Sequence, residues 1–262
     1  MPFLRKSRGH AHAPLPLLLF FIFLCFSLTI FNTQHLFSIS ASYITPCDIK
    51  SDKFTDCVKE QIEIALPKFT NGIPELGVPS IDPVHLKNIE VLGNGLNLTF
   101  SEAAMHGISQ CKLTELNKAE GSFSLSFKGN LSLTAQYVAD GRILILPIKG
   151  SGDAFVEAQG VEVHIDSKLV HDKDSTGDHF KLATPKYKYT IERTTFDLKN
   201  LFNGNKQLAE TTLQFANENW QQLMDELSPP AIKQIVRTVV KAINKFFSKV
   251  TIKQMIKGYG DE

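Results

Sequence analysis

The sequence carries little net charge of either sign. Its 262 residues contain 28 Lys and Arg against 27 Asp and Glu, a formal charge of +1 with His neutral. Nucleic acids and anionic membrane surfaces attract proteins that gather positive charge on one face. The balance over the whole chain supplies no such excess, so neither kind of partner is predicted.

Motifs for catalysis and for metal binding are also lacking. GISQC, residues 107–111, is the nearest match to the nucleophile elbow G-x-S-x-G, but it lacks the final Gly and follows no strand-then-helix pattern. HDKDSTGDH, residues 171–179, offers oxygen atoms at the spacing of a calcium loop, but Ala183 stands where a bidentate Glu is required, which favours a polar hairpin turn. GSGD, residues 150–153, joins two strand patterns and opens no helix, which argues against phosphate binding. We expect no enzymatic activity, no metal and no cofactor.

Cysteine is scarce as well. Beyond residue 42 the chain has Cys47, Cys57 and Cys111, so in an oxidising compartment one pair and one free thiol are expected. Cys47 and Cys57 lie on either side of a predicted helix start and are the predicted pair. Cys111 lies in phase with Leu113 in a predicted strand over residues 108–116. It is interpreted as a buried free thiol rather than a reactive one.

The first 42 residues differ from the rest of the chain. Three basic residues precede the apolar run at residues 17–31, and small residues follow at positions 38–42, which is the order of a secretory signal peptide. The alternative is an uncleaved anchor, which needs about 20 apolar residues; polar residues interrupt this run. We predict a signal peptide at residues 1–42 and a secreted, extracellular domain at residues 43–262, without stable membrane insertion. Removing three basic residues leaves 25 against 27 acidic ones.

A short helix is predicted at the start of the domain. Ser51 or Asp52 can cap it, and apolar residues recur at helical spacing from Phe54 until Pro67, which is predicted to end it. GIPELGVPSIDPVHL, residues 72–86, follows with three prolines, which fix φ and deter further helix. This segment is therefore expected to be extended.

From about residue 86 to residue 199 apolar and polar residues alternate. Asn94 and Gly95 suit a hairpin turn, and glycines punctuate the later strands, so a long antiparallel sheet with one apolar face is predicted. Two glycosylation sequons begin at Asn97 and Asn130, and each Asn belongs to the polar phase of its strand. Both are predicted glycosylation sites on an outward face. The alternating apolar positions include Phe123, Leu125, Phe127, Leu131, Leu133, Tyr137, Val161, Val163 and Ile165.

Helical spacing returns at the carboxyl end. An amphipathic helix of about 20 residues or more is predicted after Pro229 and Pro230, preceded by a shorter helix whose apolar residues run from Leu213 to Leu227. A helix that covers the apolar face of the sheet is preferred over one on a membrane surface, which needs a free apolar stripe. Its apolar stripe comprises Ile232, Ile235, Val236, Val239, Val240, Ile243, Phe246, Phe247 and Val250. Its opposite side carries Lys233, Arg237, Lys241 and Lys245.

Three collinear blocks resemble the insect takeout and juvenile-hormone-binding proteins. They are PCDIKSDKFTDCVKEQIEIALPKFTNGIPELGVPSIDP at residues 46–83, LPIKGSGDAFVEAQGVEV at residues 146–163 and LFNGNKQLAETTLQFANENWQQLMDEL at residues 201–227. The resemblance implies an α+β, TULIP-like fold. In it a long, curved antiparallel sheet wraps around the carboxyl-terminal amphipathic helix and encloses an apolar tunnel. Since Cys111 has no partner, the second bridge of some haemolymph juvenile-hormone carriers has no support, which favours the broader takeout branch.

The resemblance also implies a function. The expectation is a secreted carrier that binds a small lipophilic ligand, terpenoid, juvenile-hormone-like or fatty-acid-like, in the tunnel. The alternative is a secreted interaction protein of the same fold that engages a receptor or a microbial lipid. Each candidate for the tunnel lining is also a candidate for plain core. These candidates are Leu223, Leu227, Ile232, Val236, Val240, Ile243 and Phe247.

Overall fold

The computed structural model describes residues 44–93, 95–119 and 122–260; the predicted signal peptide lies outside these ranges. Within them, eight strands form one sheet in the order β2-β4-β6-β7-β8, with β3 paired to β4, β5 to β6 and β9 to β7. Its strands are β2 (Val84–His85), β3 (Ile89–Gly93), β4 (Leu96–His106), β5 (Lys112–Ala119), β6 (Ser122–Ile143), β7 (Leu146–Asp174), β8 (Gly177–Thr190) and β9 (Arg193–Leu198). The short strands β1 (Cys47–Asp48) and β10 (Ile256–Lys257) pair in parallel. The helices are α2 (Phe54–Thr70), α3 (Lys206–Glu218), α4 (Trp220–Phe247) and α5 (Ile252–Met255), with 3₁₀ turns η1 (Pro74–Leu76), η2 (Ile108–Gln110) and η3 (Phe202–Gly204).

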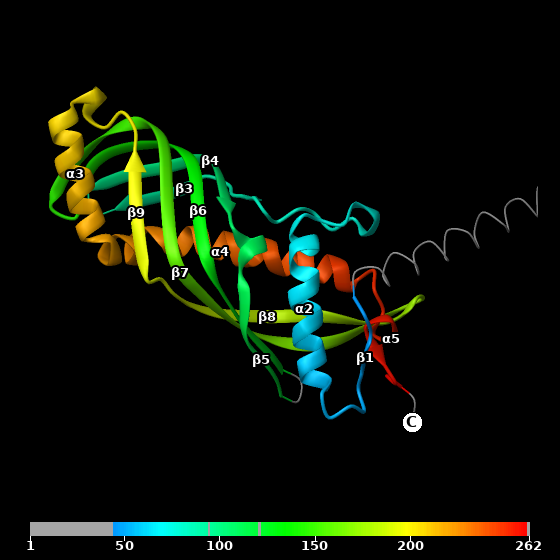
Figure 1. Ribbon diagram of the computed structural model, residues 1–262. Coiled ribbons are helices and arrows are strands. Elements are labelled where there is room, and N and C mark those ends of the chain that lie inside the picture. The colour runs from blue at the N-terminus through cyan, green and yellow to red at the C-terminus, as the bar shows by residue number, and fades with distance from the viewer. Residues whose placement is uncertain (1–43, 94, 120–121, 261–262) are drawn as a thin grey trace, which may run out of the picture. The chain divides into compact units, whose positions relative to one another are not determined.

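The two long strands β6 and β7 are the spine of the sheet. They pair antiparallel from Ser122 opposite Lys168 to Ile143 opposite Leu146. β5 and β4 divide the other side of β6 between them, and β8 and β9 divide the other side of β7. Helix α4 runs along the inner side of the curved sheet, in contact with β3, β8 and β9 (Figure 1). The predicted α+β fold, a long antiparallel sheet around a carboxyl-terminal helix, is confirmed.

One extra residue in β7 bends this spine. Gly129 lies opposite Val161, but Leu131 lies opposite Ala158, so β7 carries a bulge. Gly160 occupies it with φ of +58°, a left-handed conformation that favours glycine, and a Cβ there would meet the side chain of Glu192 at 2.3 Å. Because of the bulge, the buried positions of β7 change from even to odd numbers along the chain.

Both sequons lie on exposed residues. Asn97 is exposed on β4 and Asn130 on β6, as their polar phase predicts. Asn130 has a second task, because its Oδ1 accepts the N–H of Gly160 at 2.9 Å and so closes the bulge. A glycan would be attached through the amide nitrogen of Asn130, and this hydrogen bond uses only Oδ1. The two are therefore compatible. Glycosylation of the two residues stays a prediction.

Two strand boundaries differ from the sequence analysis. The strand expected over residues 108–116 begins only at Lys112, because η2 folds residues 108–110 into a turn and leaves Cys111 outside the ladder. GSGD, residues 150–153, does not join two strands but lies inside the continuous β7. The polar turn predicted at residues 171–179 is confirmed, since Asp174 and Gly177 are the last pair of the β7–β8 hairpin.

The predicted ends of α2 were wrong. Neither Ser51 nor Asp52 caps it; Lys53 precedes the first turn, and Ser51 Oγ accepts the N–H of Lys53 instead, at 3.2 Å. Pro67 lies inside the helix, which continues to Thr70. The continuation is stabilised by Thr70, whose hydroxyl donates to the carbonyls of Leu66 at 2.9 Å and Pro67 at 3.1 Å.

The predicted break at Pro229 and Pro230 was also wrong, because α4 runs through both prolines. Each proline removes one hydrogen bond to the carbonyl four residues earlier. Those carbonyls belong to Asp225 and Glu226, which are exposed, so water can replace the lost donors. The chain breaks instead at Asn219, whose side-chain amide donates to the carbonyl of Phe215 at 2.8 Å and ends α3. No helix in the described ranges is long and apolar enough to cross a membrane.

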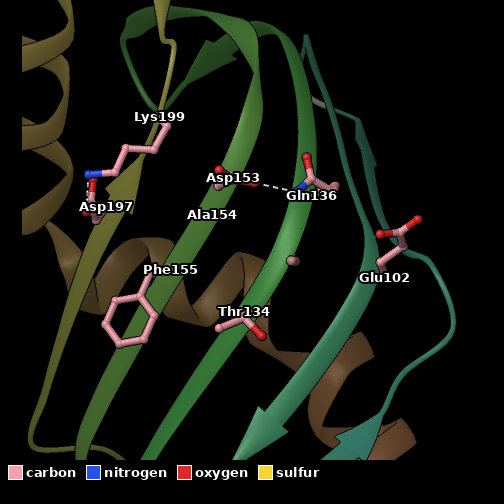
Figure 2. A pocket seen from close by; sticks show the side chains of 9 residues that line it. Glu102, Thr134, Gln136, Asp153, Ala154, Phe155, Asp197 and Lys199 are labelled. Atoms are coloured by element: carbon pink, nitrogen blue, oxygen red, sulfur yellow. Dashed lines mark hydrogen bonds and ion pairs between the residues drawn. The ribbon is translucent and has the colours of Figure 1, made fainter.

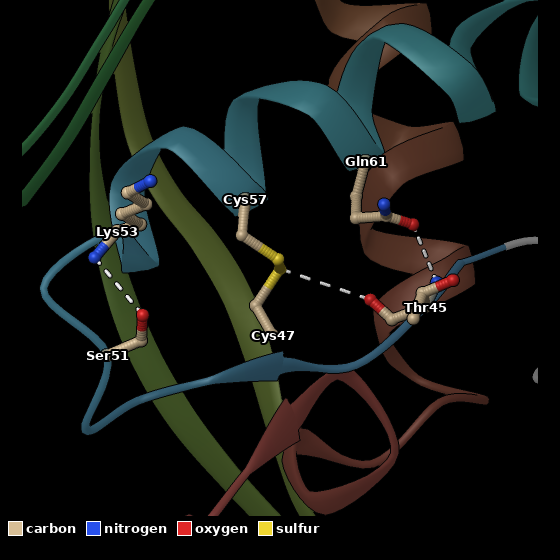
Figure 3. Close-up of a disulfide and its surroundings, with 6 residues drawn as sticks. All are labelled: Thr45, Cys47, Ser51, Lys53, Cys57 and Gln61. Atoms are coloured by element: carbon tan, nitrogen blue, oxygen red, sulfur yellow. Dashed lines mark hydrogen bonds between the residues drawn. A yellow bond between two sulfur atoms is a disulfide. The ribbon is translucent and has the colours of Figure 1, made fainter.

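The predicted disulfide between Cys47 and Cys57 is confirmed, with a Cα–Cα distance of 5.9 Å (Figure 3). Cys47 lies in β1, which pairs with β10 near the carboxyl end, and Cys57 lies in the first turns of α2. The Thr45 N–H donates to Gln61 Oε1 at 2.6 Å beside it. The bridge therefore joins the amino-terminal strand, the carboxyl-terminal strand and α2.

Replacing both cysteines by serine should lower the free energy of unfolding. Closing a loop of this length restricts the unfolded chain by about 3 kcal/mol. We expect a loss of about that size in urea denaturation of the Cys47→Ser/Cys57→Ser variant. Reduction of the unmodified protein should give the same loss, and an unchanged midpoint under both treatments would contradict the prediction.

Asp82, in the proline-rich segment at residues 72–86, accepts hydrogen bonds that stabilise a neighbouring connection. Asp82 accepts the backbone N–H of Gly107 at 3.0 Å and of Ser109 at 2.8 Å, and so holds the connection between β4 and β5. Burial alone raises the pKa of Asp82, but hydrogen bonds from Ser109 and Gly107, together with nearby His106, outweigh it and lower the pKa. The ionised form is therefore the one that the fold stabilises.

Asp82→Asn should destabilise the protein in a pH-dependent way. A lowered pKa means that the carboxylate adds stability above its unfolded pKa of about 3.9, and that this stability is lost as the pH falls through the lower folded value. We expect a loss of about 1–2 kcal/mol at pH 7, typical of hydrogen bonds to a charged group. Urea denaturation at neutral pH and at about pH 3 measures it. A difference from the unmodified protein that does not shrink in acid would count against this role.

Candidate functional site

In the described residues, apolar side chains of the sheet and the helices form three groups. One is built on Leu113, Leu125 and Ile165, and the other two include residues of α4. The larger group, which we call the main core, fills the space between β4, β6, β7 and β9 and helices α3 and α4. The smaller group, which we call the α4–β8 cluster, is built on buried Leu182, Val236 and Val240. Its partly buried members are Phe123, Leu169, Tyr187, Ile232, Ile243 and Phe247.

The seven residues predicted to line a tunnel all belong to α4, which is unbroken. Leu223 and Leu227 are buried in the main core. The other five, Ile232, Val236, Val240, Ile243 and Phe247, come together in the α4–β8 cluster, where Phe247 also touches the main core. The structure therefore brings five of the predicted residues into one region and places two in another.

The α4–β8 cluster is incompletely buried. Its three buried members are surrounded by six apolar side chains that keep part of their surface accessible, from both the helix and the sheet. The accessible part of these six side chains is apolar surface that a further contact can still bury. A lipophilic molecule that covered this surface would be stabilised by its removal from water.

Two helix asparagines fix the helices to the outer strands of the sheet. The side-chain amide of Asn244 accepts the N–H of Leu182 at 2.8 Å and donates to its carbonyl at 3.0 Å. Asn217 does the same for Phe196 in β9, at 2.7 and 3.1 Å. Each asparagine thus satisfies both backbone groups of one strand residue, and we call these contacts the amide clamps.

A weaker clamp and a buried histidine hold the opposite side and the end of α4. Gln234 accepts the N–H of Lys87, just before β3, at 2.9 Å, and donates to its carbonyl at 3.4 Å. The buried ring of His179 in β8 donates its Nδ1–H toward the carbonyls of Phe247 at 2.7 Å and Val250 at 3.1 Å. Both partners are carbonyls, so Nδ1 carries the proton. Together these contacts set how α4 lies against the sheet.

The sequence analysis missed the amide clamps. The available signal was weak: asparagine is a poor residue for a helix interior, since its side chain competes for backbone hydrogen bonds. Asn244 nevertheless lies inside the predicted amphipathic helix, directly after apolar Ile243. An interior asparagine at such a position suggests a partner outside the helix, but only the fold identifies that partner.

A shallow depression of about 330 Å³ lies on the outer, polar face of the sheet (Figure 2). Gln136 donates to Asp153 across it, and Lys199 pairs with Asp197 at 2.7 Å. These polar groups satisfy one another and are open to water, which does not suit a lipophilic ligand. The residues that line it are Glu102, Thr134, Ala135, Gln136, Asp153, Ala154, Phe155, Asp197 and Lys199.

A row of polar side chains on the same face has the composition of a hydrolytic triad. Ser126 Oγ lies 2.7 Å from His164 Nδ1, and His164 Nε2 lies 3.2 Å from Asp166 Oδ1. Ser126 is only 3% exposed, although its phase predicts an outward position. β6 is paired on both sides here, with Ser126 opposite Glu115 in β5 and His164 in β7, and Ser126 Oγ also donates to Glu115 Oε2 at 3.3 Å. The row is a cross-strand hydrogen-bond network.

Cys111 is a free, half-buried thiol. Burial, and then the charge of Asp82, raises its pKa to about 11. The thiol is therefore protonated at neutral pH, in agreement with the interpretation of Cys111 as unreactive. In the described ranges no three His, Cys, Asp or Glu side chains gather in a way that could hold a metal ion.

Comparison with known proteins agrees with this architecture. The family profile for haemolymph juvenile hormone binding protein (JHBP) matches residues 20–257. The chain is 30% identical over 212 residues to the circadian clock-controlled protein daywake of Drosophila melanogaster, covering 73% of this chain and 80% of that protein. It is 20% identical over 214 residues to a putative beta-carotene-binding protein of Schistocerca gregaria, covering 79% and 86% respectively. The crystal structure of Epiphyas postvittana Takeout 1 matches with a TM-score of 0.75 at 28% identity, over 81% of this chain and 99% of that one.

Removing the clamp at Asn244 should cost more stability than removing the one at Gln234. Asn244→Ala leaves the N–H and carbonyl of buried Leu182 without partners, for a loss of about 2–3 kcal/mol. Gln234→Ala frees backbone groups of exposed Lys87, which water can satisfy, and should cost less than about 1 kcal/mol. Urea denaturation of the two variants measures the difference. Equal losses in the free energy of unfolding would show that the Asn244 clamp on Leu182 contributes no more to stability than the Gln234 clamp on Lys87.

Proposed function

The chain belongs to the haemolymph juvenile hormone binding protein family, and from that premise we propose that it is a secreted carrier of a small lipophilic ligand. The proposed binding region is the α4–β8 cluster, between the inner face of the sheet and α4. The observation that carries the proposal is the ring of half-buried apolar side chains in this cluster. The tunnel lining proposed at its centre consists of Ile232, Val236, Val240, Ile243 and Phe247, with Leu223 and Leu227 toward the main core.

The binding free energy would come chiefly from apolar contact. A ligand that buries roughly 300 Å² of apolar surface gains about 7 kcal/mol before the costs of association. The family name and the name of the Schistocerca gregaria relative refer to a juvenile hormone and to beta-carotene, both lipophilic molecules. These names support a terpenoid-like or fatty-acid-like ligand as the class.

A pair of hydroxyls is suited to orient such a ligand. The Tyr189 hydroxyl in β8 lies 2.8 Å from Ser228 Oγ in α4. Ser228 donates its proton to the carbonyl of Met224, so Tyr189 is the donor in the pair. Ser228 lies next to Leu227 in sequence and one helical turn before Ile232. An ester or carboxyl oxygen of the ligand could accept from Tyr189 in place of Ser228.

Secretion rests on independent features of the chain. The disulfide between Cys47 and Cys57 suits an oxidising compartment. The two sequons lie on exposed residues, where a glycan can be attached. The proposed signal peptide at residues 1–42 supplies the route.

Filling the cluster should weaken ligand binding. Ile243→Trp adds a large ring to the accessible side of the α4–β8 cluster, whereas Val138→Trp adds the same ring on the outer face, where Val138 is 60% exposed. With N-phenyl-1-naphthylamine as a fluorescent probe and oleate as competitor, we expect Ile243→Trp to bind at least about tenfold more weakly, because it loses more than about 1.4 kcal/mol of apolar contact. Val138→Trp should bind like the unmodified protein.

Native mass spectrometry of the protein from its source tests the same proposal without a probe. A discrete mass that is lost on denaturation would identify the ligand. If the protein carries no such mass and also does not bind the fluorescent probe, the carrier function is contradicted. That result would favour a secreted interaction protein that engages a receptor or a microbial lipid.

A further inference from the structure

The last part of the chain carries positive charge alone. From Leu227 to Gly260 the sequence contains seven Lys and Arg residues and no Asp or Glu. The seven stand at every fourth position. They are Lys233, Arg237, Lys241, Lys245, Lys249, Lys253 and Lys257.

The first five of these residues form what we call the cationic stripe. A spacing of four places side chains in one row on a helix surface, and Lys233 to Lys245 lie within α4 while Lys249 follows directly after it. All five are exposed, whereas the opposite side of α4 is packed against the sheet. At 1.5 Å per residue the row is about 24 Å long.

The charge of the stripe is uncompensated. In the described part of the chain, none of its five residues forms an ion pair, although other cations such as Lys128 and Lys199 do. Like charges four residues apart repel and weaken a helix. The row is therefore unfavourable for the isolated helix and would be relieved by negative charge from outside the molecule.

The near-neutral net charge conceals this separation. Carboxylates lie on the other side of the sheet, where Glu102, Asp153 and Asp197 border the outer depression. A negatively charged surface would therefore attract the stripe more strongly than the outer face, where carboxylates and cations such as Asp197 and Lys199 are paired. The sequence analysis argued against anionic membranes because the net charge of the whole chain is near zero. That argument does not hold for the exposed face of α4 alone.

We propose that the cationic stripe docks the protein peripherally on an anionic lipid surface. A specific protein partner usually engages buried aromatic or apolar anchors, yet none of the exposed large apolar residues of the described chain lies on α4. Four of the five charges are lysines, which act as point charges and suit the diffuse charge of lipid headgroups. The apolar face of α4 is already covered, so the contact involves headgroups without insertion.

The inference stands on the charges of α4 and holds whether or not the interior takes a ligand. It adds to the proposed carrier a way to approach the membranes between which a lipophile would move. The vesicle-binding experiment described below does not need a bound ligand, either in the vesicles or in the measurement.

Vesicle sedimentation tests the proposal with the protein secreted by expressing cells, its amino terminus identified by mass spectrometry. The vesicles contain either phosphatidylcholine alone or phosphatidylcholine with about 30 mol% phosphatidylserine, at about 50 and about 300 mM NaCl. The test variant is Lys233→Gln/Arg237→Gln/Lys241→Gln. The matched control, Lys50→Gln/Lys53→Gln/Lys112→Gln, removes three exposed positive charges elsewhere.

Binding should require phosphatidylserine, and it should fall steeply at the higher salt concentration because the charges are screened. Each cation near the surface contributes about fivefold in affinity, so the stripe variant should bind at least about tenfold more weakly, and the control within about twofold of the unmodified protein. Glutamine is a good helix former and relieves the like-charge repulsion, so the stripe variant should unfold at an equal or higher urea concentration.

Three results would overturn the proposal. The first is no binding to phosphatidylserine vesicles at the lower salt concentration. That result would favour an acidic protein as the partner of the stripe. The second is equal binding to both kinds of vesicle. The third is a loss in the control as large as in the stripe variant, which would assign the attraction to total charge.

Discussion

Side-chain amides from the helices pair with single residues at the edges of the open sheet. Exposed edge strands carry unpaired N–H and carbonyl groups, which natural proteins cover. Here Asn244 covers Leu182 in β8 and Asn217 covers Phe196 in β9, while Gln234 holds the chain just before β3. An amide that both donates and accepts fixes the helix in position and in rotation. The direction in which every other α4 side chain points depends on this.

The fixed rotation gives α4 two chemically different faces. Val236 and Val240 point toward the sheet, and Arg237 and Lys241 point away from it. His179 holds the end of the helix by donating to the carbonyl of Phe247, its last residue, and to that of Val250 just after it. The apolar face packs against the inner side of the sheet, and the charged face meets solvent. One helix thus serves as a wall of the proposed binding region and as the proposed docking surface.

The sequence predicted the features that depend on neighbours along the chain. The period of two identified β6 and β7, and the spacing of Cys47 and Cys57 identified the disulfide. Helix ends were predicted less well, because proline disfavours a helix locally but is tolerated where water can reach the released carbonyls, as at Pro229. The amide clamps were beyond prediction, since an asparagine at position 244 reveals nothing of its partner 62 residues away. The change of phase at Gly160, which marks the bulge, was not predicted.

The frame suits the proposed binding region, because the fold does not rest on that region alone. Most proteins need a close-packed centre, because apolar burial is their main source of stability. Besides its apolar core, this protein has stabilising contacts at the perimeter: the long β6–β7 ladder, the disulfide that joins β1 to α2, and the clamps that hold α4. The partly buried apolar side chains around Val240 can then exchange contacts for those with a ligand without loss of the fold. A ligand that covers this surface would add stability in proportion to its affinity, because it binds only the folded chain.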